Sequence, residues 1–571
     1  MSASDKLKVV LCWHMHQPQY QDLLSGDYHL PWTYLHATKD YIDMAAHLRA
    51  VPGARAVVNF APILLEQIDD YARQLHAYLN QGTPIRDTLL AALANPVLPQ
   101  EPAARMVLAE ACVRANEHRL IDPYPQFKLL ADMVRWYRRH PEGLAYVNEG
   151  FLADLLVWYH LAWMGETTRR RDERVARLMD RQSGYTLEDR RQLLQIICEQ
   201  LSSVVEQYRA LAEQGQVELS MTPYAHPIMP LLLDTRAAQD AMPGVELPAG
   251  GQYPGGEERV RWHIVEGIRV FERYFGFRPA GCWPSEGGVS AATLRLLGEH
   301  GFRWAASGET VLANSLKAVN GGEVDPTKRW LHAPYRLEEA ATACFFRDDG
   351  LSDAIGFKYA DWHADDAVGD FVHHLENIAT ACADARQDCV VSVILDGENA
   401  WEYYPNNGYY FLSALYARLA DHPSIELTTF SAALDAVAPR PLATLTAGSW
   451  VYGSFSTWIG DTDKNRGWDM LIDAKRVFDR LVSEGRLGGE RLERATRQLA
   501  ICEGSDWCWW FGDYNPANSV SAFERLYRLH LANLYQIMGE APPEYLAHSF
   551  THGGGSPATG GVMRQGQQPQ A

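Results

Sequence analysis

Val391-Ser392-Val393-Ile394-Leu395 runs directly into Asp396-Gly397-Glu398-Asn399-Ala400-Trp401-Glu402. The first half is a short apolar run rich in β-branched residues, which predicts a strand buried on both faces. Three carboxylates and a tryptophan crowd the end of that strand. Because burying so much charge is costly unless it serves a purpose, the stretch predicts a core strand that delivers acidic side chains to a functional site.

Similar apolar runs recur along the chain and are separated by helical patterns. They cover residues 7–13, 54–63, 217–222, 281–285, 303–306, 343–347 and 389–395. Strands that alternate with helices form a parallel sheet. The seven runs therefore predict an α/β fold, a closed (β/α)7-type barrel.

The remaining segments predict the domain organisation. Residues 1–435 are expected to form the barrel, with a helical insertion near 165–215 in which Thr186 and Asp189 make a capping box. Residues 436–550 are expected to form a mainly helical C-terminal domain. The tail, 551–571, is rich in Gly, Gln and Pro and is expected to be disordered.

Composition narrows the range of partners. The 571 residues include 71 acidic and 52 basic side chains, for a net charge of -19. A strongly acidic surface repels phosphate backbones and anionic lipids, so we expect no nucleic-acid or membrane partner. The N-terminus shows no signal peptide, and the nine cysteines, Cys382 and Cys389 among them, are scattered without metal or redox spacing. These features predict a cytoplasmic protein. Its oligomeric state is not predicted.

Polar side chains follow several of the expected strands. His14 and His16 end the first, His226 follows the third, Glu286 follows the fourth and Asp396 follows the seventh. Reacting groups of parallel barrels lie at the C-terminal strand ends, where two carboxylates are what glycosidic cleavage needs. The two histidines point to one side, where they can bind sugar hydroxyls or a metal, although a structural pair gives the same pattern. An exposed loop position is the alternative for Glu286.

Aromatic side chains supply a second indication of a sugar-binding site. Trp450, Tyr452, Phe455 and Trp458 cluster in the sequence, as do Trp507, Trp509 and Trp510. Such rings are more often core than ligand platforms. The polar neighbours Asp461 and Asp506 favour a sugar site, because sugars stack their flat C–H faces on aromatic rings.

The motifs together resemble glycoside hydrolase family 57. The matching stretches are His16-Gln17-Pro18, Trp283-Pro284-Ser285-Glu286-Gly287, Phe346-Arg347-Asp348, Asp396 to Glu402, and Glu503-Gly504-Ser505-Asp506-Trp507. The resemblance implies a (β/α)7 barrel whose helical C-terminal region helps to close the site. It also implies a retaining mechanism in which Glu286 attacks the anomeric carbon and Asp396 acts as acid and then as base. The substrate-binding residues that we expect are His14, His16, His226, Trp283, Arg347, Trp401, Trp458 and Asp506. That chemistry requires no metal or other cofactor.

Within that family, the Asp-Gly-Glu-Asn-x-Trp-Glu and Trp-Pro-Ser-Glu-Gly forms look most like the α-amylase and amylopullulanase type, which predicts glycogen, maltodextrin or starch as the α-glucan substrate. A 4-α-glucanotransferase or branching-type transglycosylase of the same family is one alternative. A metal-dependent amidohydrolase is another, since it also uses His-x-His after a first barrel strand and an Asp after the last. A non-catalytic glycogen-binding protein is the third.

Overall fold

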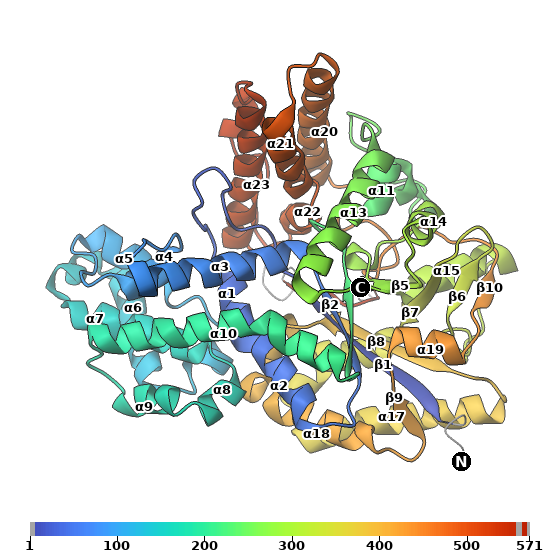
Figure 1. Cartoon of the computed structure of the whole chain (residues 1–571), viewed down its shortest axis with the longest axis horizontal. Coiled ribbons are helices and arrows are strands. Elements are labelled where there is room, and N and C mark those ends of the chain that lie inside the picture. Colours follow the sequence, from blue (N-terminus) through green and yellow to red (C-terminus); the bar gives the residue numbers. More distant parts are fainter. Residues whose placement is uncertain (1–5, 556–561, 568–571) are drawn as a thin grey trace.

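The computed structural model describes residues 6–555 and 562–567, and a closed barrel of seven parallel strands lies at its centre (Figure 1). The strands are β1 (Leu7–Met15), β2 (Ala56–Phe60), β3 (Val217–Met221), β4 (Gly281–Cys282), β5 (Trp304–Gly308), β7 (Ala343–Arg347) and β8 (Val390–Asp396). Each pairs in parallel with the next, and β8 returns to β1. The predicted (β/α)7-type barrel is confirmed.

Three short strands extend the sheet outside the barrel. β6 (Tyr335–Leu337) runs antiparallel to β7, and β10 (Arg440–Leu442) pairs with β6. β9 (Ile425–Leu427) pairs with the first residues of β1.

Strand alternation and register place the polar side chains. Successive strand residues point to opposite faces, so every second side chain of β1 and β8 points into the barrel. Val10 and Cys12 pack there with Ile394 and with rings from other strands. The next inward position on each strand is polar, and the register pairs these two residues, His14 and Asp396, directly. The C-terminal end of the barrel therefore collects polar groups above an apolar interior.

Helices surround the barrel. They are α1 (Trp32–His36), α2 (Ile42–Ala50), α3 (Pro62–Gln81), α11 (Met229–Leu233), α12 (Ala238–Ala241), α13 (Gly256–Phe275), α14 (Ala291–Glu299), α15 (Glu309–Asn320), α16 (Asp349–Asp353), α17 (Ala364–Asp384), α18 (Tyr409–Ala420) and α19 (Phe430–Ala436). Phe430 and Ala433 of α19 pack with the barrel interior. Glu218, near the start of β3, accepts hydrogen bonds from Ser431 of α19, so α19 covers the end of the barrel opposite His14 and Asp396.

The segment between β2 and β3 is a large helical insertion, on the left in Figure 1. Beyond α3 it contains α4 (Thr88–Ala94), α5 (Pro102–Ala111), α6 (Pro125–Arg139), α7 (Glu149–Ala162), α8 (Glu166–Arg171), α9 (Glu173–Arg181) and α10 (Leu187–Glu213). The expected capping box of Thr186 and Asp189 is present at the start of α10. The insertion begins well before the expected residue 165, since α4 already starts at Thr88. Of its helices, α7 is buried on almost every side and so lacks the one-faced periodicity of a surface helix.

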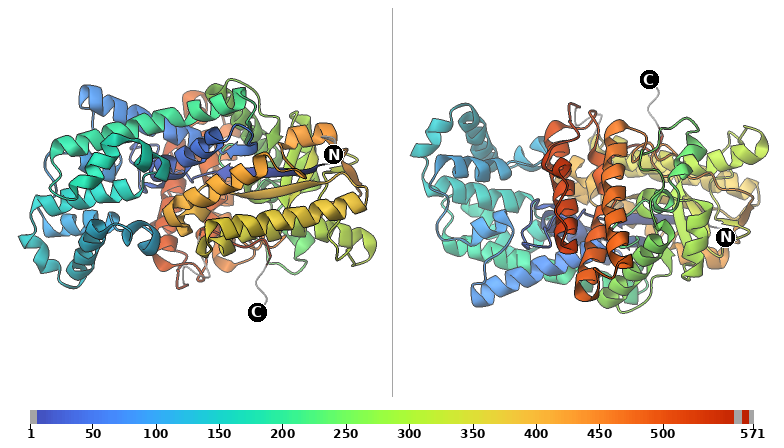
Figure 2. Two further views of the ribbon diagram at one scale, coloured as in Figure 1. Left: turned by 90° about the horizontal axis from the view of Figure 1, so that it is seen from below. Right: turned by 90° about the horizontal axis from the view of Figure 1, so that it is seen from above.

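The C-terminal region is helical and stands beside the barrel, at the top of Figure 1 and in the centre of the right-hand view of Figure 2. Its helices are α20 (Thr462–Ser483), α21 (Gly489–Cys502), α22 (Asp506–Trp510) and α23 (Ala517–Met538). Part of the expected tail is described and is held in place. The Gly566 N–H donates to Asp353 at 3.0 Å, and Arg564 donates to the Thr457 hydroxyl at 3.1 Å. Residues 556–561 and 568–571 lie outside the described part.

The cysteines differ from the expectation of scattered thiols. Cys382, on α17, and Cys389, just before β8, are joined by a disulfide. Spacing alone did not reveal the pair, because the turn between helix and strand is what brings the two residues together. Seven other cysteines are free. In the described ranges, no helix is both long and apolar enough to cross a membrane.

Candidate active site

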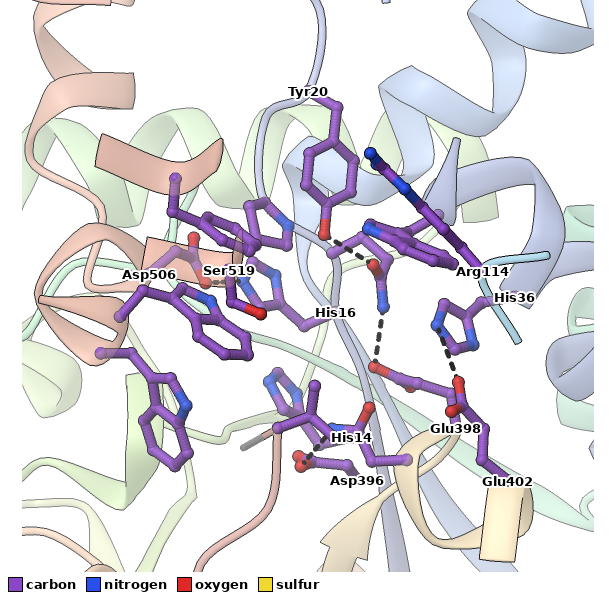
Figure 3. A pocket seen from close by; sticks show the side chains of 18 of the residues that line it. His14, His16, Tyr20, His36, Arg114, Asp396, Glu398, Glu402, Asp506 and Ser519 are labelled. Atoms are coloured by element: carbon purple, nitrogen blue, oxygen red, sulfur yellow. Dashed lines mark hydrogen bonds and ion pairs between the residues drawn. The ribbon is translucent and has the colours of Figure 1, made fainter. Parts of the chain in front are cut away.

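A cavity of about 300 Å³ opens at the C-terminal ends of the barrel strands (Figure 3). Glu286 and Asp396 both line it, together with His14 and His16 of the first strand end. The insertion and the C-terminal helices supply the rest of the wall, for example Trp163 and Trp509 respectively. The cavity thus combines two carboxyls from different strand ends with aromatic rings.

Glu286 is held in an unusual backbone conformation. It lies in a single 3-10 turn, η6 (Ser285–Gly287), with φ 57° and ψ 25°, in the left-handed region that non-glycine residues seldom adopt. The Trp450 indole Nε1 donates to Glu286 Oε2 at 2.9 Å, and the Trp450 N–H donates to the Glu286 carbonyl at 3.1 Å. Two contacts from one residue fix the direction of the carboxyl, and strain of this kind is typical of functional sites.

Asp396 is the last residue of β8, and the following turn fixes it. The Gly397 N–H donates to the His14 carbonyl at 2.7 Å. A Cβ at position 397 would lie 2.1 Å from the Met15 sulfur, so any larger residue there would displace the Met15 side chain. The Asn399 amide donates to Asp396 Oδ2 at 2.9 Å.

The two carboxyls have raised pKa values. Burial, followed by the negative charge of Asp396, raises the pKa of Glu286 to about 8, against the hydrogen bond from Trp450. Burial raises the pKa of Asp396 to about 6. Near neutral pH the pair therefore holds one proton between two carboxyls, which is the state in which one group can donate a proton while the other acts as a nucleophile or base.

Three histidine rings stack beside the carboxyls. The ring centroids of His16 and His226 lie 3.8 Å apart, and those of His14 and His226 lie 5.1 Å apart. Burial and the neighbouring histidines lower the pKa of His14 to about 3 and that of His226 well below its usual range. These two rings are therefore neutral, each with one donor and one acceptor nitrogen.

A chain of hydrogen bonds assigns the tautomers of the two neutral rings. The Thr222 hydroxyl donates to Asn59 Oδ1 at 2.8 Å, and the same oxygen lies 2.7 Å from His14 Nδ1, so His14 Nδ1 carries a proton. His14 Nε2 then accepts from His226 Nε2 at 3.1 Å. His226 Nδ1 in turn accepts from the Ser505 hydroxyl at 2.8 Å.

The C-terminal region reaches the site through Asp506, the first residue of α22. Its Oδ1 lies 2.7 Å from His16 Nε2, and both residues line the cavity (Figure 3). Donor atoms of His16, His226 and Asp506 lie within 4.8 Å of one another, a spacing that a cation can bridge. Because both ring nitrogens of His226 already contact protein atoms, we assign no metal to this group.

Comparison with known proteins identifies the family of the chain. The model of glycosyl hydrolase family 57 matches residues 10–446. The chain belongs to glycosyl hydrolase family 57. It is therefore an enzyme of a family of glycoside hydrolases and transglycosylases that act on α-glucans with retention of configuration, and the amidohydrolase alternative falls away.

Solved structures share the fold of this family 57 chain. A family 57 branching enzyme from Thermococcus kodakaraensis has a TM-score of 0.56 at 15% identity, covering 93% of this chain and 90% of that one. A branching enzyme of the same type from Pyrococcus horikoshii has a TM-score of 0.56 at 14% identity, covering 95% and 98%. The α-amylase AmyC from Thermotoga maritima has a TM-score of 0.53 at 14% identity, covering 94% and 97%. No curated protein matches this chain.

Five residues that we expected to bind substrate do not line the cavity of the family 57 enzyme. One is His226, which is buried and stacks on the ring of His16. Two of the other four support Trp450. The buried Arg347 donates to Asp349 at 2.7 Å and to Asp353 at 2.6 Å, and its guanidinium lies 5.1 Å from the Trp450 ring. Trp283 lies in the barrel interior, edge-on to Trp450 at 5.6 Å.

The other two are core residues. Trp401 is buried, donates to the Gly397 carbonyl at 2.9 Å and packs edge-on to Trp13 at 5.8 Å. Trp458 is buried with its ring 6.1 Å from that of Trp509, which does line the cavity. Motif position alone cannot separate a ring that touches ligand from one that supports such a ring.

The sequence reasoning did not assign several cavity residues. Tyr20 donates to Gln17 at 3.0 Å, and Gln17 donates to Glu398 at 3.2 Å (Figure 3). Burial and the charge of Asp396 raise the pKa of Glu398 well above its usual range. Gln17 stands in the His-Gln-Pro stretch and Glu398 beside Asp396, so the motifs held a signal for both. His36, which faces Glu402 in the cavity, lies in none of the motifs, so the sequence did not indicate its position.

Proposed function

We propose that this enzyme hydrolyses internal linkages of α-glucans, with Glu286 as nucleophile and Asp396 as acid and then base. The proposal rests on the pairing of Glu286 with Asp396. Two buried carboxyls from different strand ends line one cavity and hold one proton between them near neutral pH. A pair of carboxyls in those two states is what retaining cleavage uses.

The first step forms a glycosyl-enzyme. The Glu286 carboxylate attacks the anomeric carbon, the bond to the leaving oxygen breaks, and the Asp396 proton passes to that oxygen. In the second step Asp396 takes a proton from water, whose oxygen displaces Glu286 from the anomeric carbon. Two inversions restore the starting configuration.

The resting pKa order is the reverse of these roles, since it leaves the proton on Glu286. Bound sugar changes the balance. Positive charge that develops at the anomeric carbon beside Glu286 favours its ionised form, while a glycosidic oxygen beside Asp396 favours a protonated acid there. We therefore rest the roles on the position of Glu286 in the Trp-Pro-Ser-Glu-Gly motif rather than on the pKa order of the empty site.

The polar side chains beside the two carboxyls support a site for an uncharged sugar. His14 and His226 carry no charge near neutral pH, and His16 is bonded to Asp506. His16 and Asp506 line the cavity, and imidazole and carboxylate groups in such a position exchange hydrogen bonds with sugar hydroxyls. An uncharged polysaccharide is also compatible with the net charge of -19.

The forms of the two catalytic motifs favour the α-amylase and amylopullulanase type over a transferase. Product analysis on maltoheptaose, glycogen and pullulan tests this type. We expect new reducing ends and short maltooligosaccharides. Chains longer than the maltoheptaose supplied would identify a 4-α-glucanotransferase or branching-type enzyme instead. Binding of glycogen by the wild type without any release of reducing sugar would favour the non-catalytic alternative.

The cytoplasmic location inferred from the sequence stays a prediction. The Cys382–Cys389 disulfide weighs against a reducing compartment, whereas the seven free cysteines fit one. Thiol titration of the protein purified under non-reducing conditions, with and without prior reduction, measures whether the disulfide forms.

A further inference from the structure

A second cavity, of about 550 Å³, continues from the candidate active site. Asn116 of the insertion and Val562 of the C-terminal segment line both cavities, so the two share a wall. Phe357 lines the second cavity and also a third one beyond it, of about 640 Å³. The three cavities therefore adjoin one another, beginning with the one that the two carboxyls line.

The elements around the second cavity belong to the same end of the barrel as Glu286 and Asp396. They are η7 (Ala354–Lys358) and η8 (Tyr359–Asp361), which follow β7, and η9 (Asn399–Tyr403), which follows β8. The insertion adds η3 (Glu117–Ile121), which contacts η8 and η9 through Arg119. Substrates of parallel barrels bind at this end, so a ligand that enters the first cavity meets the second without crossing the molecule.

Two aromatic side chains in the second cavity face solvent. Tyr403 is 43% exposed and Phe357 is 39% exposed. Within the described residues, no contact between aromatic rings involves either of them. Large apolar side chains exposed beside a cavity mark a binding surface more often than a structural one. Their free faces offer what the C–H face of a sugar stacks on.

Polar groups beside these rings are held in place before any ligand binds. Arg119 donates to the Tyr403 carbonyl at 2.7 Å and to Asp361 at 3.0 Å, so it ties the insertion to both barrel loops. The Asp361 side chain is 86% exposed, and Asn116 and His118 line the same cavity. Both signs of charge and neutral donors occur, and this mixture suits the hydroxyl groups of an uncharged ligand better than an anion.

We propose that the second cavity is a distal binding site for the same α-glucan chain whose linkage is cleaved. One chain then spans from Glu286 and Asp396, past Asn116 and Val562, to the rings of Tyr403 and Phe357. The inference rests on the proposed function and adds to it a preference for long chains over short ones.

The test measures binding without turnover, in the Glu286→Gln background. Tyr403→Ala and Phe357→Ala are combined there, and affinities for maltotriose and for soluble amylose are measured by calorimetry. The matched control is Tyr146→Ala, which removes a ring that is 91% exposed on the insertion and lies outside these cavities. Both rings are exposed, and Arg119 bonds the backbone of Tyr403 and not its side chain, so we expect unchanged melting temperatures.

We expect the double variant to bind amylose about tenfold more weakly than the control, because two stacking faces are lost. The effect on maltotriose should be smaller, since a short chain that occupies the first cavity does not reach the rings. Equal affinities of the double variant and the control for amylose would overturn the distal site while leaving the proposed function intact. A Glu286→Gln protein that binds no α-glucan of any length would overturn both.

Discussion

Trp450→Phe should shift the pH dependence of catalysis without emptying the space that Trp450 fills. The indole Nε1 donates to Glu286 Oε2 at 2.9 Å, and its ring packs against Trp283 at 5.6 Å and under the Arg347 guanidinium at 5.1 Å. Phenylalanine keeps an aromatic ring in that place and removes the donor. The substitution therefore isolates one hydrogen bond to Glu286, the proposed nucleophile.

The expected magnitude follows from the charge of that hydrogen bond. A hydrogen bond to an ionised group contributes about 1.5–3 kcal/mol, and one pKa unit corresponds to about 1.4 kcal/mol. The bond favours the carboxylate, so its loss should raise the pKa of Glu286 by about 1–2 units above the value near 8 that burial and Asp396 already produce. Because the nucleophile must be ionised, kcat/KM on the acidic side should fall about 10- to 100-fold.

The assay measures kcat/KM against pH on an α-maltosyl fluoride. Fluoride leaves without a proton, so the acidic limb reports the ionisation of the nucleophile. Trp468→Phe is the matched control, because Trp468 donates its indole N–H to the Trp458 carbonyl at 3.0 Å and does not contact Glu286. An acidic limb that stays where the control has it, or that moves to lower pH, would refute the role given to Trp450.

Three further predictions follow from the same contacts. Asp396→Asn should still react with an α-glycosyl fluoride and, with azide, yield the α-glycosyl azide, whereas Glu286→Ala with azide should yield the β-azide. NMR identifies the azide that each variant forms. If each variant gave the other azide, the roles of Glu286 and Asp396 would be exchanged. Arg564→Gln should also move the acidic limb of kcat/KM upward, because the positive charge of Arg564 lowers the pKa of Glu286. Arg564→Lys, which keeps that charge, should leave the limb closer to its wild-type position; a limb unmoved in the glutamine variant would show that this charge does not act on Glu286. Glu503→Gln should lower the free energy of unfolding by about 3–5 kcal/mol at pH 7, because it leaves the buried Arg259, 2.8 Å away, without its charge partner. Burial opposes the ionised form of Glu503, but Arg259 and its other partners prevail and lower its pKa from 4.5 to about 2. The wild type should therefore lose its greater free energy of unfolding over Glu503→Gln as the pH falls from 4.5 toward 2. Denaturant titrations in which this difference stays constant over that range would contradict the role given to the Glu503–Arg259 pair.

The barrel and its strand ends could be predicted because their signal is local. The run before Asp396 is apolar over a strand length, and alternation then fixes which residues point inward. The same reasoning places His14, which the register pairs with Asp396. Two of the residues that line the cavity therefore follow from strand pattern alone.

The remaining site residues depend on contacts between distant segments. Trp450 reaches Glu286 across 164 positions of sequence, and Asp506 reaches His16 across 490. The hydrophobic periodicity of the sequence does not indicate contacts between residues so far apart. Trp401 is the converse case: its place in the motif that follows Asp396 predicted substrate binding, but its side chain packs into the core.

If Glu286 is the nucleophile, it carries the sugar in the covalent intermediate, and a trapped intermediate shows which residue does so. A 5-fluoro-α-glucosyl fluoride should form the glycosyl-enzyme quickly and release it slowly, so the wild-type protein can be trapped, digested and analysed by mass spectrometry. We predict the label on the peptide that contains Glu286, at Glu286 itself, and none in Glu286→Gln. A label on Asp396, or one that persists in Glu286→Gln, would contradict the claim.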